Sequence, residues 1–175
     1  MCLRGEFLIF FLPDFYFISV TDITTEFLQK HEIKAILLDI DNTLSQHGST
    51  EPYNGVKNWL DEVRKIGINL AIISNNKEER VRLFAQNLNL DYYISDANKP
   101  FKVGFYIAKD LLKVEQKNIL VVGDQIFTDI LGANLSGMKS VLVEPKDKNE
   151  PILIKVKRVV EFPFRFVAKM KYKKR

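Results

Sequence analysis

Two aspartates, Asp39 and Asp41, stand at the end of an apolar run that begins at Ala35. Such a run is typical of a buried parallel strand. Buried carboxylates are costly unless they are paired or bind a metal. We therefore expect a magnesium-dependent site, in which Asp39 attacks a substrate as a nucleophile and Asp41 acts as a general acid and base.

Three later segments place further polar residues after apolar runs. Ser74 and Asn75 follow the run 70–73, Lys99 follows a short run at 92–94, and Asp124 follows the run 119–122. Ligands of open α/β sheets bind outside the carboxyl ends of the strands. These residues, although distant in sequence, are therefore predicted to converge on one crevice with the two aspartates.

This ordered set of motifs resembles the haloacid dehalogenase (HAD) phosphatase superfamily. The pattern runs from Asp39-Ile40-Asp41-Asn42-Thr43 through Ser74 and Lys99-Pro100 to Gly123-Asp124 and Asp129. The resemblance covers residues from about 13 to 145. It is closer still to the small YqeG-type phosphatases of subfamily IIIA, with which the chain also shares Pro13-Asp14, residues 19–23 and Arg80-Val81.

The resemblance implies a role for each motif residue. Mg²⁺ would be held by Asp39, by the main-chain carbonyl of Asp41 and by Asp124. The Ser74 hydroxyl, the Asn75 main-chain amide and the Lys99 ammonium would bind the transferring phosphoryl group. Thr43 and Asp129 would contact these residues without binding the substrate directly. Asp129 would hold Lys99 in preference to reaching the metal.

The hydrophobic pattern predicts alternating strands and helices, and hence a mainly parallel sheet with right-handed crossovers. The expected strands are 35–40, 68–74, 92–94, 119–122 and 140–143, and the expected helices are 53–65, 77–88, 101–112 and 126–136. The fold class is thus α/β, a three-layer Rossmann-like core of HAD type. The segments between Asp41, Ser74 and Lys99 are too short for an inserted cap domain, so a capless, open site is expected.

Composition fits a single domain of 175 residues that can bury a sizeable core. With Cys2 as its single cysteine, the chain has no internal disulfide, which fits a reducing cytoplasm. The basic character is concentrated at one end: residues 155–175 hold nine Lys or Arg and one Glu, and the rest of the chain is net acidic. This asymmetry indicates an anionic partner for the tail.

Both ends of the chain have more than one interpretation. The apolar segment within residues 1–20 is interpreted as packed on the domain, with interfacial membrane contact as the alternative, and no signal-peptide cleavage site follows it. The basic, aromatic tail 151–175 fits a solvated tail, a peripheral contact with anionic lipid at the inner face of the membrane, or, less favourably, a nucleic acid.

The expected activity is hydrolysis of a phosphate monoester through an aspartyl-phosphate. An open site, an apolar N-terminal segment and a basic tail agree with phosphatidylglycerophosphate, a substrate of subfamily IIIA relatives. A soluble sugar phosphate or nucleotide is the alternative within the enzyme class. The alternative outside it is a non-catalytic adaptor that keeps the HAD scaffold and binds RNA or the ribosome through its tail.

Overall fold

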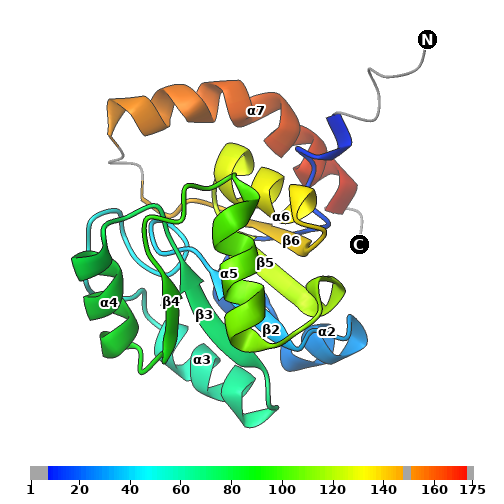
Figure 1. The fold of residues 1–175 in the computed structure, drawn as a ribbon. Helices are drawn as coiled ribbons and strands as arrows, with labels where there is room; N and C mark the ends of the chain where they lie inside the picture. Colours follow the sequence, from blue (N-terminus) through cyan, green and yellow to red (C-terminus); the bar gives the residue numbers. More distant parts are fainter. Residues whose placement is uncertain (1–7, 148–150, 173–175) are drawn as a thin grey trace.

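A six-stranded parallel sheet forms the centre of the molecule in the computed structural model, which describes residues 8–147 and 151–172 except the side chain of Leu153 (Figure 1). The strands, in the order in which they pair, are β1 Phe15–Phe17, β6 Lys139–Val143, β5 Ile119–Gly123, β2 Ala35–Leu38, β3 Asn69–Ile73 and β4 Tyr92–Ile94. All five pairings are parallel. The predicted α/β class is confirmed, and each of the five expected strands is present.

Helices cover both faces of the sheet and make it the middle of three layers. One face packs against α2 Thr25–Lys30, α3 Val56–Lys65 and α4 Glu78–Asn87, and the other against α5 Lys102–Leu112 and α6 Leu131–Leu135. Short helical turns occupy Val20–Asp22 (η1), Gln116–Asn118 (η2) and Ile126–Ile130 (η3), the last of them π-helical. The helix expected over 126–136 is therefore two elements, η3 and α6.

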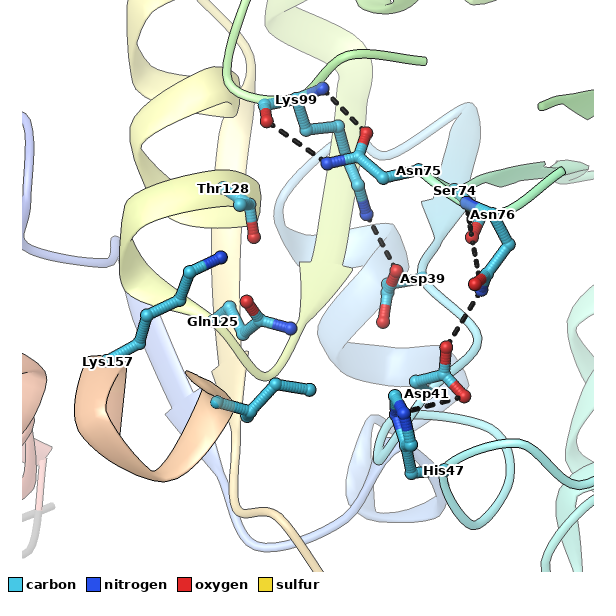
Figure 2. Close-up of a pocket in the computed structure, with 11 residues that line it drawn as sticks. Asp39, Asp41, His47, Ser74, Asn75, Asn76, Lys99, Gln125, Thr128 and Lys157 are labelled. Carbon is cyan, nitrogen blue, oxygen red and sulfur yellow. Dashed lines mark hydrogen bonds and ion pairs between the residues drawn. The ribbon is translucent and has the colours of Figure 1, made fainter. Parts of the chain in front are cut away.

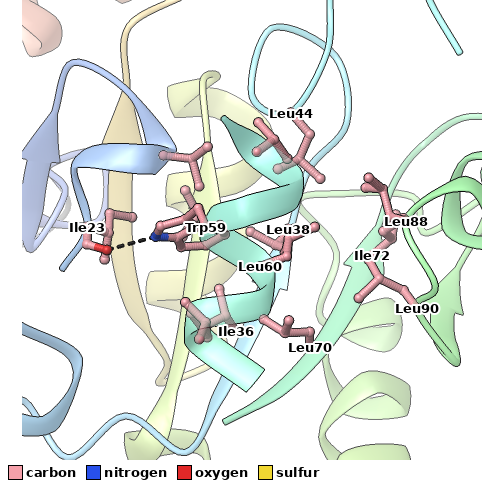
Figure 3. Packing of buried hydrophobic residues seen from close by; sticks show 14 of the residues in the cluster. Ile23, Ile36, Leu38, Leu44, Trp59, Leu60, Leu70, Ile72, Leu88 and Leu90 are labelled. Atoms are coloured by element: carbon pink, nitrogen blue, oxygen red, sulfur yellow. Dashed lines mark hydrogen bonds between the residues drawn. The ribbon is translucent and has the colours of Figure 1, made fainter. Parts of the chain in front are cut away.

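Alternation along the strands assigns side chains to the two faces. Ile36 and Leu38 of β2 point into the α3 side, and Leu37 points into the α5 side. On α3, Trp59 and Leu60 are buried against the sheet (Figure 3). The Trp59 indole Nε1 donates a 2.8 Å hydrogen bond to the carbonyl of Ile23, which joins α3 to the segment after η1. This packing fixes β2, and with it the aspartates that follow.

The connections after β2 and β3 are short. Residues 39–68 contain a loop and α3, and residues 74–91 contain α4. Neither connection includes a folded cap, as the sequence predicts for an open site.

At both ends of the chain the structure shows elements that the sequence did not predict. Within the N-terminal segment, Phe15–Phe17 forms β1 at the edge of the sheet, a strand that is not among the five expected ones. The basic tail forms α7, Ile152–Tyr172, and its Glu161, Arg165 and Ala168 are buried against the domain. The interpretation as a solvated tail is therefore wrong for these residues. Cys2 and the rest of 1–7, with 173–175 of the tail, lie outside the described residues.

None of the helices in the described part of the chain has the length and apolar character needed to cross a bilayer.

Candidate active site

The expected polar residues gather around a cavity of about 170 Å³ at the carboxyl end of the sheet (Figure 2). Asp39 follows β2, Ser74 follows β3 and Lys99 follows β4. The cavity is lined from four loops and from α7 by Asp39, Asp41, His47, Ser74, Asn75, Asn76, Lys99, Gln125, Thr128, Ile154 and Lys157. Asp124, after β5, lies behind this lining and is fully buried.

Lys99 is the buried cation of the site. Its Nζ donates to Asp39 Oδ1 at 2.7 Å, to Asp129 Oδ1 at 2.6 Å and to the carbonyl of Ile73 at 2.9 Å. Burial alone would lower the pKa of Lys99, but the Asp129 and Asp39 carboxylates outweigh it and raise that pKa. The side chain therefore stays protonated beside the candidate nucleophile, and Asp129 lies where it can hold it.

Asp39 has an unusually basic carboxylate. Burial raises its pKa to about 7, against the opposing effect of Lys99, and the nearby Asp129 charge adds to the rise. The Thr43 hydroxyl lies 3.5 Å from Asp39 Oδ2, at the limit of a hydrogen bond. A higher carboxylate pKa goes with higher nucleophilicity, provided that the group is ionised when substrate binds.

Asp41 is held by a set of donors from three segments. Arg80 of α4 donates through both terminal nitrogens, at 2.6 Å to Oδ1 and 3.0 Å to Oδ2. Asn76 Nδ2 donates to Oδ2 at 2.8 Å, the Gly48 amide donates to Oδ1 at 2.9 Å, and His47 Nδ1 lies 3.5 Å from Oδ1. Burial would raise the pKa of Asp41, but the hydrogen bonds from Arg80, Asn76 and Gly48 together hold it below its usual value.

The residues after β3 form a rigid turn above the strand end. The Ser74 hydroxyl accepts from the amide of Asn76 at 3.2 Å and from its side chain at 3.0 Å. The Asn75 side chain accepts from the Lys99 amide at 2.7 Å and donates to the Lys99 carbonyl at 3.1 Å. Ser74 and Lys99, 25 residues apart in sequence, are thus fixed relative to each other by one amide side chain.

Asp124 is contacted by two arginines of α7. The Arg158 guanidinium pairs with the Asp124 carboxylate and donates to its main-chain carbonyl at 2.7 Å, and Arg165 donates to the same carbonyl at 2.7 Å. Burial raises the pKa of Asp124 well above its ordinary value, the Asp39 and Asp129 charges add to this rise, and Arg158 opposes it. A cation beside Asp124, such as Arg158, favours the ionised form of its carboxylate.

The donor set suits a hard divalent cation. One carboxylate oxygen each from Asp39, Asp124 and Asp129 lie within 4.8 Å of one another, and all three residues are buried. Asp124 Oδ1 is buried and has no hydrogen-bond partner among the described residues. Oxygen ligands of this kind fit Mg²⁺. Asp129 is the least available of the three, since its two oxygens already accept from Lys99 and from the Gln125 amide.

Gly123 allows this crowding. A Cβ built on it would lie 2.3 Å from Asp129 Cγ and 2.4 Å from Asp129 Oδ2. A side chain at position 123 would therefore displace the carboxylate that holds Lys99. The π-helical turn η3 starts three residues later and carries Asp129, so strand end and turn form one unit.

All of the residues predicted from the sequence lie together at this site, and further residues contact Asp41 and Asp124. Asn76 and Arg80 hold Asp41, and Arg158 and Arg165 reach Asp124. Arg80 falls within the Arg80-Val81 motif identified from the sequence, but the sequence did not assign a role to it. The two arginines carry no local signal, because their contacts span more than 30 residues. His47 is half-buried in the cavity wall.

Comparison with known proteins agrees with the geometry. A family model described as mitochondrial PGP phosphatase matches residues 8–146. The probable phosphatase YqeG of Bacillus subtilis is 34% identical over 152 residues, which cover 87% of this chain and 88% of that protein. Phosphatidylglycerophosphate phosphatase 1 of Arabidopsis thaliana, chloroplastic/mitochondrial, is 24% identical over 157 residues, 82% of this chain and 45% of the plant protein.

Solved structures share the fold. A HAD phosphatase from Thermococcus onnurineus superposes with a TM-score of 0.56 at 17% identity, covering 73% of this chain and 98% of that one. The cobalt-bound deoxy-D-mannose-octulosonate 8-phosphate phosphatase of Haemophilus influenzae gives 0.50 at 14% identity, over 80% and 87% of the two chains.

Proposed function

Since this chain belongs to the PGP phosphatase family and is a phosphatase of the HAD type, we propose that it hydrolyses phosphatidylglycerophosphate with Mg²⁺, through an aspartyl-phosphate on Asp39. The observation that carries this proposal is the contact between the buried Asp39 carboxylate and Lys99 in a cavity that also contains Ser74. This contact places a candidate nucleophile beside a positive charge that can stabilise a transferring phosphoryl group.

In the first half-reaction a carboxylate oxygen of Asp39 attacks phosphorus, and the bond from phosphorus to the leaving oxygen breaks. Lys99 lies 2.7 Å from Asp39, so its charge is available to the phosphoryl oxygens as they approach. Ser74 and the Asn75 amide are placed to donate to the same oxygens. Asp41 gives its proton to the leaving alkoxide.

In the second half-reaction Asp41 accepts a proton from water, which attacks the phosphorus of the aspartyl-phosphate and releases Asp39. The hydrogen bonds that lower the pKa of Asp41 favour its ionised form and suit this role as a base. Arg80 and Asn76 also fix the direction of the carboxylate, so they act as positioning residues.

Asp39, the main-chain carbonyl of Asp41 and Asp124 would hold Mg²⁺. When bound, the ion neutralises charge between the nucleophile and the phosphate and polarises a phosphoryl oxygen. Arg158 now pairs with Asp124, and this pairing competes with a cation for the same carboxylate.

The lipid substrate is supported by the family description and by the name of the plant relative. The open cavity also suits it, because a headgroup phosphate can enter while the acyl chains remain outside. Its α7 wall, formed by Ile154 and Lys157, presents an apolar side chain and a cation to such a headgroup.

The test is phosphate release from phosphatidylglycerophosphate in mixed micelles, with Mg²⁺ and with EDTA. Wild type should release phosphate only with Mg²⁺, and Asp39→Asn should lose at least about 10³-fold in kcat because the nucleophile is gone. Asp110→Asn, an exposed carboxylate on α5, is the matched control and should keep full activity.

Two results would contradict the proposal at different levels. Hydrolysis of an aryl phosphate without release from the lipid would keep the mechanism and remove the lipid, leaving a soluble sugar phosphate or nucleotide. Turnover of neither substrate by a folded protein would favour the adaptor function.

A further inference from the structure

Helix α7 differs from an ordinary surface helix because it buries charged residues and also exposes apolar ones. The side that faces the domain contains Arg158, Glu161 and Arg165, whose charges pair with each other and with Asp124. Surface helices normally bury an apolar stripe and expose their charges. Here the charged residues share the buried side with Ala168 and Phe164, which pack against Ile126, Ile130 and Leu142. The apolar residues on the opposite side of the helix are exposed.

The opposite side of α7 is an exposed apolar strip. Its members recur at helical spacing along the whole element: Ile152, Val156, Val159, Val160, Phe162, Phe166, Val167 and Met170. Exposure reaches 74% at Val159 and 65% at Phe162. In Figure 1 the helix, orange to red, lies along the outside of the molecule. A contiguous apolar patch of this length marks an interaction surface.

The charges beside the strip define the partner. Lys155, Lys157, Lys169 and Lys171 are exposed on α7, and its single acidic residue, Glu161, is fully buried. An apolar face bordered by lysines is the pattern of a helix that lies in the plane of an anionic bilayer, with the ammonium groups at the headgroups. A second copy of the chain would bring two lysine-bordered strips together, and RNA would leave the aliphatic side chains in water.

We propose that the outer strip of α7 docks the protein on the surface of an anionic lipid bilayer. The strip is about 30 Å long, given 21 helical residues. The same helix lines the catalytic cavity through Ile154 and Lys157, so docking would hold the cavity close to the bilayer. This surface does not depend on which phosphate ester is hydrolysed, and its test is separate from turnover.

Flotation of the full chain with vesicles tests the docking surface. Wild type should bind vesicles that contain phosphatidylglycerol and should bind pure phosphatidylcholine much more weakly. Combined Val159→Gln, Phe162→Gln and Phe166→Gln should reduce binding at least tenfold and leave aryl-phosphate hydrolysis unchanged. The matched control changes three exposed apolar residues elsewhere, Leu83, Ile107 and Leu111, to Gln and should bind as wild type does.

Variants that remove a lysine charge separate the electrostatic contribution to vesicle binding from the apolar contribution. Lys155→Gln and Lys171→Gln should each weaken binding to the anionic vesicles by about fivefold, as expected for one basic residue near such a surface. The effect should shrink in high salt, where the charges are screened. Circular dichroism of each variant verifies that α7 and the domain remain folded.

Three outcomes would overturn the proposal. The first is equal binding by the triple variant and wild type. The second is a wild-type dimer that the triple variant converts to a monomer, with no vesicle binding, which assigns the strip to a second copy. The third is salt-dependent binding of single-stranded RNA without vesicle binding. Loss of phosphatidylglycerophosphate hydrolysis with intact vesicle binding would count against the proposed function alone.

Discussion

The Asp41 carboxylate depends on hydrogen-bond donors that lie outside the Asp39–Thr43 motif. Four groups converge on its carboxylate, and the strongest geometry is the two-pronged contact with Arg80. A guanidinium fork matches a carboxylate in both charge and shape. Arg80 therefore sets both the direction and the pKa of the proposed acid and base.

Replacing Arg80 by Gln should move the pH dependence of turnover. Without the guanidinium the ionised form of Asp41 is less stabilised, so its pKa rises. Since the base role needs an ionised carboxylate, activity is lost as pH falls through that pKa, and the acidic limb of the kcat profile should shift to higher pH.

The profile is measured with an aryl phosphate at saturating Mg²⁺. Arg82→Gln, which removes an exposed arginine of the same helix, should leave the profile unchanged. An unchanged acidic limb in Arg80→Gln would show that Asp41 is not the group that controls it.

At the scale of elements, β5 and η3 act as one unit because position 123 has no side chain. The Asp129 carboxylate fills the space that a Cβ would need, and it holds both Lys99 and the Gln125 amide. The end of β5, at Gly123, therefore packs directly against Asp129 of η3.

Gly123→Ala should therefore impair both stability and catalysis. The added methyl must push Asp129 away, which breaks its contact with Lys99 and leaves buried charge uncompensated, at a cost of about 3–5 kcal/mol in the free energy of unfolding. Urea denaturation and kcat with an aryl phosphate measure the two effects. Gly67→Ala, in open space, should cost only its backbone strain, about 1 kcal/mol. Equal effects of the two changes would contradict this account.

The elements also show which parts of the fold local sequence can predict. Buried parallel strands are continuous apolar runs, so β2, β3 and β5 and the residues after them are readable from the sequence. β1, at the edge of the sheet, is not among the expected strands. The inward side of α7 mixes Arg158, Glu161 and Arg165 with Ala168 and Phe164, so the most apolar side of the helix is not the one that packs on the domain. Arg158 and Arg165 reach Asp124 only because the chain folds back, and no local pattern encodes that contact.

For the whole molecule, metal binding should be linked to protonation and to stability. Burial gives Asp39 a folded-state pKa of about 7, above the value near 4 in an unfolded chain. Between these values the folded state binds more protons than the unfolded state. This group alone therefore makes the metal-free protein less stable as pH rises through that window. Mg²⁺ needs the ionised form, so a proton on Asp39 competes with it.

The stabilisation by Mg²⁺ should accordingly be greater at pH 8 than at pH 6. As pH falls below 7, the apparent Kd for Mg²⁺ should rise by up to about tenfold per pH unit. The increase in Tm at a fixed Mg²⁺ concentration should therefore become smaller. Thermal unfolding with Mg²⁺ and with EDTA at both pH values measures this, and Asp124→Asn should remove most of the increase. An equal Tm increase at pH 6 and pH 8 would show that Asp39 does not bind the ion.

The pairing of β1 with β6 has a consequence for protein synthesis. Phe15 lies opposite Val141, so the first strand to leave the ribosome waits for the last strand of the sheet. At about 5–20 residues per second this delay is on the order of 10 s. Asp39 and Asp41 emerge early, but Asp124 and the α7 arginines that contact it come later. A nascent chain thus carries its nucleophile long before it can assemble a working site, and that site is completed only after α7 has been synthesised.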